Sequence, residues 1–421
     1  MKDFVADWDA LRSTDPEVAD AIAGELHRER TTLRLIASEN YTSPAVLAAL
    51  ASTMNDKYAE GYPGRRYYGG CQFVDLTENL AIARAKELFG AEHANVQPHA
   101  GAQANLAVFG AFLEPRSEDK VLRLVLAHGG HLTHGSPVNV SGMWFNFIGY
   151  EVDRETEQLD YDKIRDLAKE HRPKLVLAGY TAYPRIIDWA AFRSIADEVG
   201  AILWVDASHF IGLCAGGVYP RPVPFADVVT FTTHKTLRGP RGAIVLCRQE
   251  YAKAVDKAVF PMMQGGPVEH VIAAKAVALK EAMQPGFKEY AARIVRTARA
   301  LAQGLADEGV RIVSGGTDSH LALCDLRPLG VSGKDAEAVC DEIGIAINKN
   351  GIPFDPMPPL NPSGIRVGTP GPANLGMDEP EMKEVAGILG EALRGREDGQ
   401  VKAACRARVG DLMARFPLYP S

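Results

Sequence analysis

Paired cysteines, long apolar runs and an excess of positive charge are all missing from this sequence. Its 6 cysteines are scattered without a CxxC pair, and its 421 residues include no apolar run long enough to cross a membrane. The first residues lead into an acidic stretch instead of the apolar core of a secretory signal. We therefore expect a cytoplasmic protein with reduced thiols and no membrane partner, and neither a disulfide framework nor a zinc site.

The charge balance also excludes a class of partner. With 46 basic and 53 acidic residues, the formal net charge is −7, whereas a broad nucleic-acid surface requires a basic face. We therefore expect no nucleic-acid partner. Hydrophobic residues make up 46% and charged residues 24% of the chain, which is ordinary for a globular protein.

Helical and apolar strand patterns alternate between residues 73 and 280. Alternation of this kind predicts an α/β domain with a mainly parallel sheet that is covered by helices on both faces. The expected helices lie near residues 75–89, 102–113, 160–171 and 189–199, and the expected strands near residues 121–127, 175–178, 202–205, 228–233 and 243–246.

The length predicts more than one domain, because 421 residues exceed what one hydrophobic core usually holds. We expect an N-terminal arm over residues 1–45, a large domain over residues 46–284 and a smaller α+β domain over residues 285–421. The last of these contains helical patterns near residues 288–308, 334–343, 378–394 and 400–415, and short strands near residues 311–313, 321–325 and 365–367.

The most informative stretch covers residues 227–242, where a β-branched apolar run ends at His234-Lys235 and a Gly/Pro-rich loop follows. A lysine at this position is fixed by the strand and still exposed to a pocket. Neighbouring Arg238 and Arg241, together with a bound cofactor, can lower its pKa, which is what a Schiff-base lysine requires. Lys235 is therefore the first candidate catalytic residue.

Two segments offer backbone amides to an anion. Gly101 opens a predicted helix after residues 96–100, and free amides at a helix start suit a single phosphate group. The loop at Gln264-Gly265-Gly266 is a second candidate, although a simple turn would have the same composition.

Acidic and imidazole side chains follow the predicted strands. Asp206 ends an apolar strand, and His209 follows it closely. A carboxylate there can pair with a protonated ring nitrogen, and the Asp206–Lys235 spacing allows a crossover to the neighbouring strand. A phosphate site, a strand-end aspartate and a later strand-end lysine together indicate pyridoxal phosphate, on whose ring His131 can stack. A metal site at His128, His131 and His134 lacks a matching carboxylate or helical spacing, so we expect no metal.

Two further features suggest substrate contacts. Residues 57–70 form a loop rich in tyrosine, glycine and arginine, which is typical of a pocket or a subunit contact. Arg366 lies on a predicted short strand, where a buried guanidinium can bind an amino-acid carboxylate in bidentate fashion or form a structural ion pair.

Four segments, at residues 35–40, 57–70, 128–139 and 232–242, resemble the serine hydroxymethyltransferase family, and the match runs from about residue 35 to residue 368. The resemblance implies an aminotransferase-like, fold type I pyridoxal-phosphate enzyme with a mainly parallel, seven-stranded type of sheet. It also implies transfer of the hydroxymethyl group of serine to tetrahydrofolate, which would be the co-substrate. The expected assembly is a homodimer, or a tetramer, with shared active sites.

The resemblance assigns roles to individual residues. Lys235, Glu60, His131 and Tyr68 are the implied catalytic residues. The implied cofactor-binding residues are Ser38, Tyr58, Ala100, Gly101, Ala102, His131, Asp206, His209, His234, Lys235 and Gly266. The implied substrate-binding residues are Ser38, Glu60, Tyr68, Leu126, Leu132, Asn350 and Arg366. Among these, Tyr58, Glu60, Tyr68 and Gly266 would come from the neighbouring subunit.

Several positions depart from the family pattern. Ala100 replaces a serine, Phe231 replaces a threonine, Tyr180 replaces an alanine and Met143 replaces a lysine. These changes keep three alternatives open: a threonine transaldolase that passes a glycyl unit to another aldehyde, such as a nucleoside aldehyde, a 2-methylserine hydroxymethyltransferase, and a cofactor-binding scaffold without turnover.

Overall fold

The computed structural model describes residues 7–420 and divides the chain into two compact units. One unit contains residues 45–291, and the other combines residues up to 44 with residues from 292 onward. The first six residues of the predicted N-terminal arm lie outside the described range.

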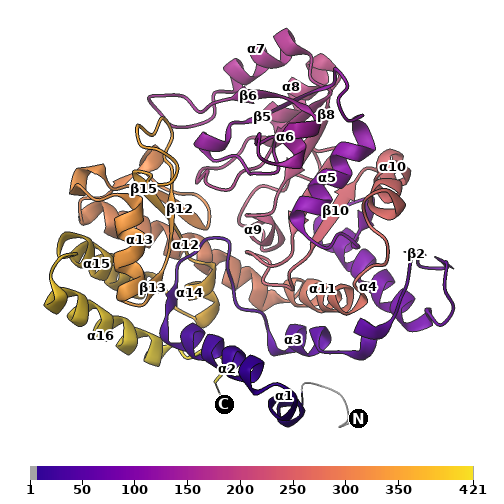
Figure 1. Ribbon diagram of the computed structural model, residues 1–421. Coiled ribbons are helices and arrows are strands. Elements are labelled where there is room, and N and C mark those ends of the chain that lie inside the picture. Colours follow the sequence, from indigo (N-terminus) through magenta and orange to yellow (C-terminus); the bar gives the residue numbers. More distant parts are fainter. Residues whose placement is uncertain (1–6, 421) are drawn as a thin grey trace. The chain divides into compact units, whose positions relative to one another are not determined.

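The unit of residues 45–291 is built on a seven-stranded sheet within the described part of the chain (Figure 1). The strand order is β4-β10-β9-β8-β7-β5-β6, and β10 alone runs antiparallel to its neighbours β9 and β4. The strands are β4 (His93–Asn95), β5 (Lys120–Leu124), β6 (Asn146–Tyr150), β7 (Leu175–Ala178), β8 (Ile202–Asp206), β9 (Val228–Thr232) and β10 (Ala243–Cys247). The expected α/β fold with a mainly parallel sheet is confirmed.

Helices of this unit cover the sheet because alternate strand residues bury opposite faces. Phe109 of α5 packs edge-on against Trp204 of β8 on one face, and Phe89 of α4 packs against Phe231 of β9 on the other. The helices are α4 (Gln72–Phe89), α5 (Gly101–Phe112), α6 (Val140–Trp144), α7 (Tyr161–His171), α8 (Trp189–Val199), α9 (Ile211–Ala215), α10 (Ala252–Lys257) and α11 (Glu269–Ala282).

Short elements complete this part of the chain. They are the hairpin of β2 (Gly61–Tyr62) and β3 (Arg65–Arg66), 3-10 turns at Thr53–Asp56, Leu126–His128 and Gln249–Tyr251, and a π-helical segment at Ala258–Met263. Two helices, α3 (Pro44–Leu50) and α12 (Pro285–Asp307), cross the limits between the units. The strand expected over residues 121–127 ends at Leu124, because the backbone turns into the 3-10 segment there.

The second unit has its own four-stranded antiparallel sheet of order β11-β12-β15-β14 within the described residues. A separate parallel pair joins β1 to β13, so the N-terminal segment packs with the C-terminal residues of this unit. The strands are β1 (Leu33–Arg34), β11 (Arg311–Ile312), β12 (Leu321–Asp325), β13 (Ile345–Ala346), β14 (Asn348–Asn350) and β15 (Gly364–Gly368). The helices are α1 (Trp8–Thr14), α2 (Pro16–Thr31), α13 (Gly333–Glu342), α14 (Pro370–Leu375), α15 (Glu379–Arg394) and α16 (Gly399–Arg415).

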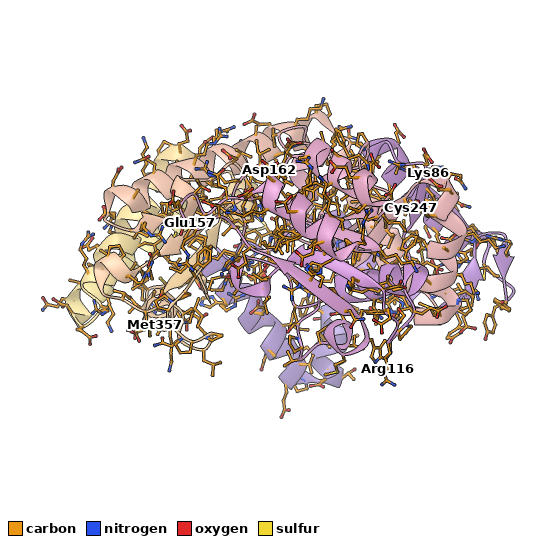
Figure 2. The ribbon with its side chains drawn as sticks, turned by 90° about the horizontal axis from the view of Figure 1, so that it is seen from above. Lys86, Arg116, Glu157, Asp162, Cys247 and Met357 are labelled. Atoms are coloured by element: carbon orange, nitrogen blue, oxygen red, sulfur yellow. The ribbon has the colours of Figure 1, made fainter. Side chains whose placement is uncertain are left out.

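Side chains separate by polarity in the expected way. Lys86, Arg116 and Asp162 are exposed to solvent, whereas Cys247 is buried (Figure 2). Each of the 6 cysteines is a buried free thiol. Among residues 7–420, no helix combines the length and the apolar character needed to span a bilayer.

Candidate active site at the carboxyl edge of the sheet

Lys235 lies three residues beyond the end of β9, in a loop that is braced at several points. The Thr233 amide donates to the Gly242 carbonyl at 3.0 Å, which closes the loop at its base. The Thr236 hydroxyl accepts from the Gly212 amide at 3.0 Å and donates to the His209 carbonyl at 2.9 Å. These contacts attach the loop to α9 and leave Lys235 partly buried.

Asp206, the last residue of β8, accepts hydrogen bonds at both carboxylate oxygens. Its Oδ2 accepts from Asn105 Nδ2 at 2.9 Å and from His134 Nε2 at 3.0 Å, and its Oδ1 accepts from the Ser208 amide at 3.1 Å. Asp206 is opposite Thr230 in the register of β8 and β9. The aspartate and the Lys235 loop therefore lie at the carboxyl ends of neighbouring parallel strands, where ligands bind in sheets of this kind.

A second layer of hydrogen bonds orients the partners of Asp206. Trp204 Nε1 donates to Thr230 Oγ1 at 3.0 Å, and that hydroxyl donates to Asn105 Oδ1 at 2.8 Å. Asn105 also donates to Thr133 Oγ1 at 2.8 Å. We call Asp206, Asn105, Thr133, His134 and Thr230 the Asp206 cluster; its side chains are all buried.

His131 lies at the rim of this cluster. Its Nδ1 is 2.7 Å from the Thr133 hydroxyl, and its ring is 5.5 Å from the ring of His134. His134 forms an ion pair with Asp206 instead of joining His128 and His131 around a metal. Within residues 7–420, no group of three or more His, Cys, Asp or Glu side chains is arranged to hold a metal ion.

The environment of Asp206 favours its charged form. Burial alone would raise the pKa of Asp206, but the hydrogen bond and charge of His134, the charge of His131 and the Ser208 hydrogen bond together outweigh it. The pKa of Asp206 consequently lies well below its ordinary value. The carboxylate is ionised at neutral pH and is suited to a cationic partner.

His234, next to the lysine, has the opposite character. Burial lowers the pKa of His234 to about 3, and the charges of Lys235 and Arg241 add to this effect. The imidazole is therefore neutral at neutral pH. Its Nδ1 is buried without a hydrogen-bond partner among the described residues.

The start of α5 faces the end of β9. A Cβ atom added at Gly101 would lie 2.7 Å from Thr232 Cγ2, so only glycine allows this close approach. Ala100, the N-cap residue, makes no side-chain cap hydrogen bond, and both Ala100 and Ala102 are exposed. The first amides of the helix are thus uncapped by a side chain and accessible to an anion.

Tyr58, Glu60 and Tyr68, which we call the Glu60 cluster, are brought together on the loop between α3 and α4. Glu60 Oε1 accepts from the Tyr58 hydroxyl at 3.3 Å, and Oε2 accepts from the Tyr68 hydroxyl at 3.5 Å. The two rings meet edge to face at 5.1 Å. Cβ atoms placed on Gly265 and Gly266 would lie 3.0 Å from Glu60 Oε1 and 3.3 Å from the Tyr58 ring, so the second glycine loop lies directly beside this cluster.

Three predicted residues belong to the other structural unit, which contains Ser38, Asn350 and Arg366. Ser38 lies in a turn after β1. Asn348 joins the other two, because its Oδ1 accepts from Arg366 Nε at 3.2 Å and its Nδ2 lies 3.5 Å from Asn350 Oδ1. Burial lowers the pKa of Arg366 to about 10, which indicates a cation that a carboxylate ligand would stabilise.

Leu126 begins the 3-10 turn and Leu132 follows His131, and the two leucines are 50% and 45% exposed. Leucine side chains that open to solvent suit contact with an apolar ring of a ligand. Both residues lie on the connection that follows β5, the strand next to β7 in the sheet.

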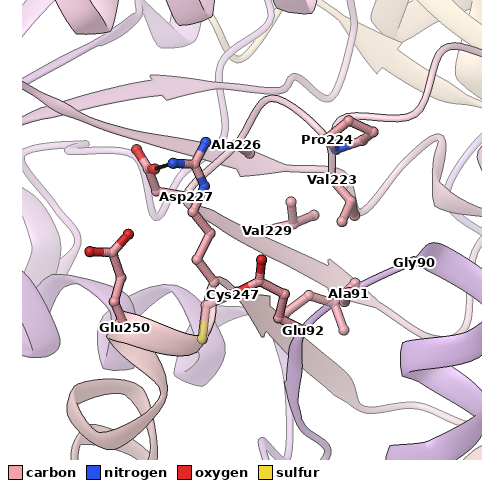
Figure 3. A pocket seen from close by; sticks show the side chains of 12 residues that line it. Gly90, Ala91, Glu92, Val223, Pro224, Ala226, Asp227, Val229, Cys247 and Glu250 are labelled. Carbon is pink, nitrogen blue, oxygen red and sulfur yellow. Dashed lines mark ion pairs between the residues drawn. The ribbon is translucent and has the colours of Figure 1, made fainter.

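A cavity of about 520 Å³ lies at the opposite end of the strands, where β9 begins (Figure 3). It is lined by residues 90–92, 223–229 and 246–250, and the Asp227–Arg248 ion pair at 3.1 Å crosses it. Asp227 immediately precedes β9, whereas Lys235 follows that strand. The cavity is therefore separate from the candidate active site.

The positions that depart from the family pattern lie mostly away from the Asp206 cluster. Phe231 is fully buried and packs against Phe89, on the face of β9 opposite Thr230. Tyr180 is buried and its hydroxyl lies 2.9 Å from the Tyr150 hydroxyl, whereas Met143 is 62% exposed on α6. Phe231 and Tyr180 therefore belong to the core.

Comparisons with known proteins agree with this geometry. A protein from Synechococcus sp. (strain JA-3-3Ab) named serine hydroxymethyltransferase is 57% identical over 423 residues, which cover 97% of this chain and 97% of the relative. A protein of the same name from Koribacter versatilis (strain Ellin345) is 55% identical over 411 residues, covering 98% of this chain and 96% of the relative. The family model described as serine hydroxymethyltransferase matches residues 11–389. With this match and these identities over almost the whole chain, the protein belongs to the serine hydroxymethyltransferase family.

Proposed function

We propose that this chain transfers the hydroxymethyl group of serine to tetrahydrofolate, giving glycine and methylene-tetrahydrofolate, with pyridoxal 5′-phosphate as its cofactor. Family membership supports the reaction. The roles of Asp206 and Lys235 are assigned from the pairing of Asp206 with Thr230. This pairing brings Asp206 and the Lys235 loop together at the carboxyl ends of β8 and β9.

The residues present fit this cofactor. Asp206 offers an ionised carboxylate for a protonated pyridine nitrogen, and the uncapped start of α5 offers amides for one phosphate. The Nδ1 atom of His234, beside the lysine, is a buried polar atom with no hydrogen-bond partner in residues 7–420, as expected where a ligand completes the site. Donors for a phosphate, an acceptor for a ring proton and an amine for an aldehyde thus occur within one structural unit.

When bound, pyridoxal 5′-phosphate supplies an electron sink that stabilises negative charge on the substrate Cα atom. Lys235 holds the cofactor through its side-chain amine, and Asp206 keeps a proton at the pyridine nitrogen. Asn105 and His134 hold the Asp206 carboxylate in place by donating to Oδ2. His131 contributes a flat ring for stacking, and His209 lines the site beside Asp206.

Residues outside the Asp206 cluster bind the two substrates. Arg366 pairs with the serine carboxylate, assisted by Ser38, and Asn350, Leu126 and Leu132 contact the pteridine ring of the folate. Glu60 exchanges a proton with the serine hydroxyl group, and Tyr58 and Tyr68 orient its carboxylate. The leucines supply apolar contact, and Asn350 supplies hydrogen bonding.

The working enzyme is a homodimer, or a tetramer, in the cytoplasm, and its active sites are shared between chains. The exposure of the Glu60 cluster supports this arrangement, because Tyr58 is 56% and Tyr68 is 47% exposed in the single chain. Aromatic hydroxyl groups arranged around a carboxylate at the surface suit insertion into the site of a second copy.

Two of the departures, Phe231 and Tyr180, give the specialised alternatives no support. Phe231 and Tyr180 are buried in the core, so they do not reshape the surface around Asp206. A transaldolase or a 2-methylserine enzyme would need a changed substrate contact. The retained Lys235, Asp206, Glu60 and Arg366 likewise argue against a scaffold without turnover.

The test is a substrate screen of the purified enzyme with serine, threonine and 2-methylserine, each with and without tetrahydrofolate, followed by mass spectrometry. We expect serine with tetrahydrofolate to give the fastest turnover. Lys235→Ala should lose activity by about a thousandfold or more and should no longer trap the cofactor with borohydride. Folate-independent transfer to another aldehyde as the fastest reaction would contradict the proposal.

A further inference from the structure

The segment that leads into α5, residues 96–99, is held by two side chains from far along the sequence. Lys275 of α11 contacts it from one direction, and Gln264, which follows the π-helical segment, contacts it from another. All these residues belong to the unit of residues 45–291. The segment ends directly before Ala100 and Gly101, where the amides of α5 become available.

Lys275 is fully buried and its ammonium group is saturated. Nζ donates to the carbonyl oxygens of Val96 at 2.7 Å, Pro98 at 3.0 Å and Ala243 at 2.9 Å. An ammonium group has three hydrogens, so these three acceptors use all of them. The lysine therefore ties the residues before α5 to the first residue of β10.

Gln264 completes the attachment by binding backbone groups of the two residues of this segment that Lys275 does not bind. Its Oε1 accepts from the His99 amide at 3.0 Å, and its Nε2 donates to the Gln97 carbonyl at 3.1 Å. Backbone groups of four consecutive residues, 96 to 99, are thus bound by the two side chains. Few rotations remain open to a segment with this many fixed groups.

Two acidic residues, Glu78 and Glu269, affect the pKa of Lys275. Burial lowers the pKa of Lys275, whereas the charges of Glu78 and Glu269 oppose that change. Glu78 Oε1 also accepts from Gln97 Nε2 at 2.8 Å, which ties the same segment to α4. Burying a lysine costs stability that an apolar side chain of similar length would not cost. Packing alone therefore does not account for a cation at this position.

We propose that Lys275 is a positioning residue that fixes residues 96–99 and thereby aims the first amides of α5 at the phosphate of the cofactor. This inference rests on the proposed function, which places that phosphate at Gly101. Lys275 has no direct contact with the cofactor in this account. It acts through the carbonyls of Val96 and Pro98, because a shift of these groups would move the start of the helix.

The test compares the affinities of the apoenzyme for pyridoxal 5′-phosphate and for pyridoxal, which lacks the phosphate. Lys275→Met keeps the length of the side chain and removes the three donors. We expect the Kd for pyridoxal 5′-phosphate to rise about tenfold to a hundredfold, while the Kd for pyridoxal changes by less than about twofold. The matched control is Arg84→Met, because Arg84 donates to the Ala276 carbonyl of α11 at 2.7 Å without touching residues 96–99. This control should leave the ratio of the two Kd values unchanged.

An unchanged ratio in folded Lys275→Met would overturn the inference. If Lys275→Met does not fold, Gln264→Met is measured instead. Its ratio of the Kd for pyridoxal 5′-phosphate to the Kd for pyridoxal should rise as well, and an unchanged ratio there has the same meaning. A wild-type enzyme that binds the two ligands equally well would instead contradict the phosphate site of the proposed function. The two failures are therefore distinguishable.

Discussion

Two carboxylates in the same structural unit, those of Asp206 and Glu269, are both buried but differ in their protonation. Asp206 is 7% and Glu269 is 1% exposed. The pKa of Asp206 lies well below its ordinary value, whereas burial, together with the charges of Glu78 and Asp75, raises the pKa of Glu269 to about 8. Burial alone would raise the pKa of either acid, so the difference must come from their neighbours.

Hydrogen bonds explain the difference. Asp206 accepts from Asn105, His134 and the Ser208 amide, whereas neither oxygen of Glu269 has a hydrogen-bond partner among the described residues. The cation nearest to Glu269, Arg66, lies 3.4 Å away.

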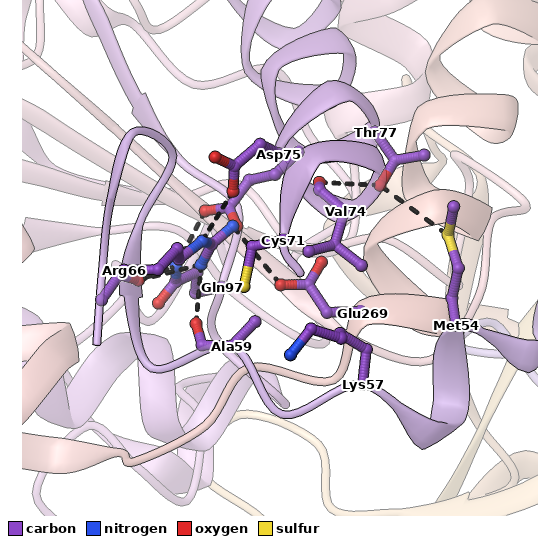
Figure 4. A network of polar contacts seen from close by, with 12 residues as sticks. Met54, Lys57, Ala59, Arg66, Cys71, Val74, Asp75, Thr77, Gln97 and Glu269 are labelled. Atoms are coloured by element: carbon purple, nitrogen blue, oxygen red, sulfur yellow. Dashed lines mark hydrogen bonds and ion pairs between the residues drawn. The ribbon is translucent and has the colours of Figure 1, made fainter. Parts of the chain in front are cut away.

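Arg66 is already occupied by other partners (Figure 4). It binds Glu78 at 2.6 Å and Asp75 at 2.8 Å. The neighbours of Asp206 therefore keep it charged for a cationic ligand, while those of Glu269 keep it protonated over much of the neutral range. Only the first arrangement suits a site that holds a proton on a cofactor ring.

The largest expected effect follows from removing the charge of Asp206. Asp206→Asn keeps the shape, but its NH2 group would face the donors of Asn105 and His134. We expect kcat to fall by about a thousandfold, with weaker cofactor binding, in steady-state assays and cofactor titrations. A variant with wild-type kcat would show that this carboxylate does not hold the ring proton.

The control for Asp206→Asn is Asp227→Asn. Asp227 lies directly before β9, at the end of strands β8 and β9 that is opposite Asp206. Asp227 is also buried and accepts from Arg193 at 2.8 Å and from the Leu203 amide at 2.8 Å. Losing these bonds should lower the unfolding free energy by about 1–3 kcal/mol in urea and leave kcat nearly unchanged. A matching loss of kcat would indicate a general effect on the sheet.

Features set by local sequence were predictable from the chain. An apolar β-branched run followed by glycine and proline gave the end of β9 and its Lys235 loop, and Gly101 begins α5 as predicted. Asp206 ends β8 as predicted, because it follows directly on an apolar run. The strand β6 was missed, because its residues Asn146–Tyr150 include asparagine and glycine and four of the five are not buried.

The partners of Asp206 could not be predicted, because they come from distant parts of the chain. Asn105 is separated from Asp206 by 101 residues and from Thr230 by 125 residues along the sequence. One signal was present, since Asn105 is a buried polar residue in the mainly apolar helix α5 and such a buried amide requires partners. His134 was considered as a metal ligand, and its partner is instead a carboxylate.

A third carboxylate, Glu60, differs from Asp206 and Glu269 because it lies near the surface, beside the exposed tyrosines of its cluster. We expect Glu60→Gln to lower kcat by roughly a hundredfold and to leave cofactor affinity nearly unchanged, because an amide cannot exchange the proton. The decisive measurement is a mixture of Glu60→Gln and Lys235→Ala after dissociation and reassociation. If each active site combines Lys235 and Glu60 from different chains, about one quarter of the sites will be intact.

Mixing Lys235→Ala with Asp206→Asn provides the matched control. Lys235 and Asp206 belong to one edge of one sheet, so every site in that mixed dimer carries a defect and no activity should return. Recovery in the control, or none in the mixture of Glu60→Gln and Lys235→Ala, would contradict sharing of the Glu60 cluster between chains.

The last expected effect concerns Glu269 and is seen in stability. Its folded pKa of about 8 lies above the unfolded value of about 4.3, so between these values the native state binds more protons than the unfolded state. Stability contributed by this group is therefore present at low pH and is lost as the pH rises through 8. Asp206 has the opposite sign, since its lowered pKa contributes stability that is lost as the pH falls below about 4.

Glu269→Gln removes this titration and keeps the size of the side chain. We expect the variant to gain about 4 kcal/mol of unfolding free energy relative to wild type between pH 5 and pH 9, with most of the change complete by pH 8, measured by urea unfolding across that range. The exposed Glu114 provides the control variant Glu114→Gln, whose difference from wild type should stay constant. If the curves of wild type and Glu269→Gln instead run parallel, Glu269 is ionised throughout and Arg66 stabilises it as effectively as the hydrogen bonds stabilise Asp206. An arginine shared among three carboxylates would then keep a buried acid ionised as well as the hydrogen-bond donors around Asp206 do. The two carboxylates would no longer differ in protonation at neutral pH.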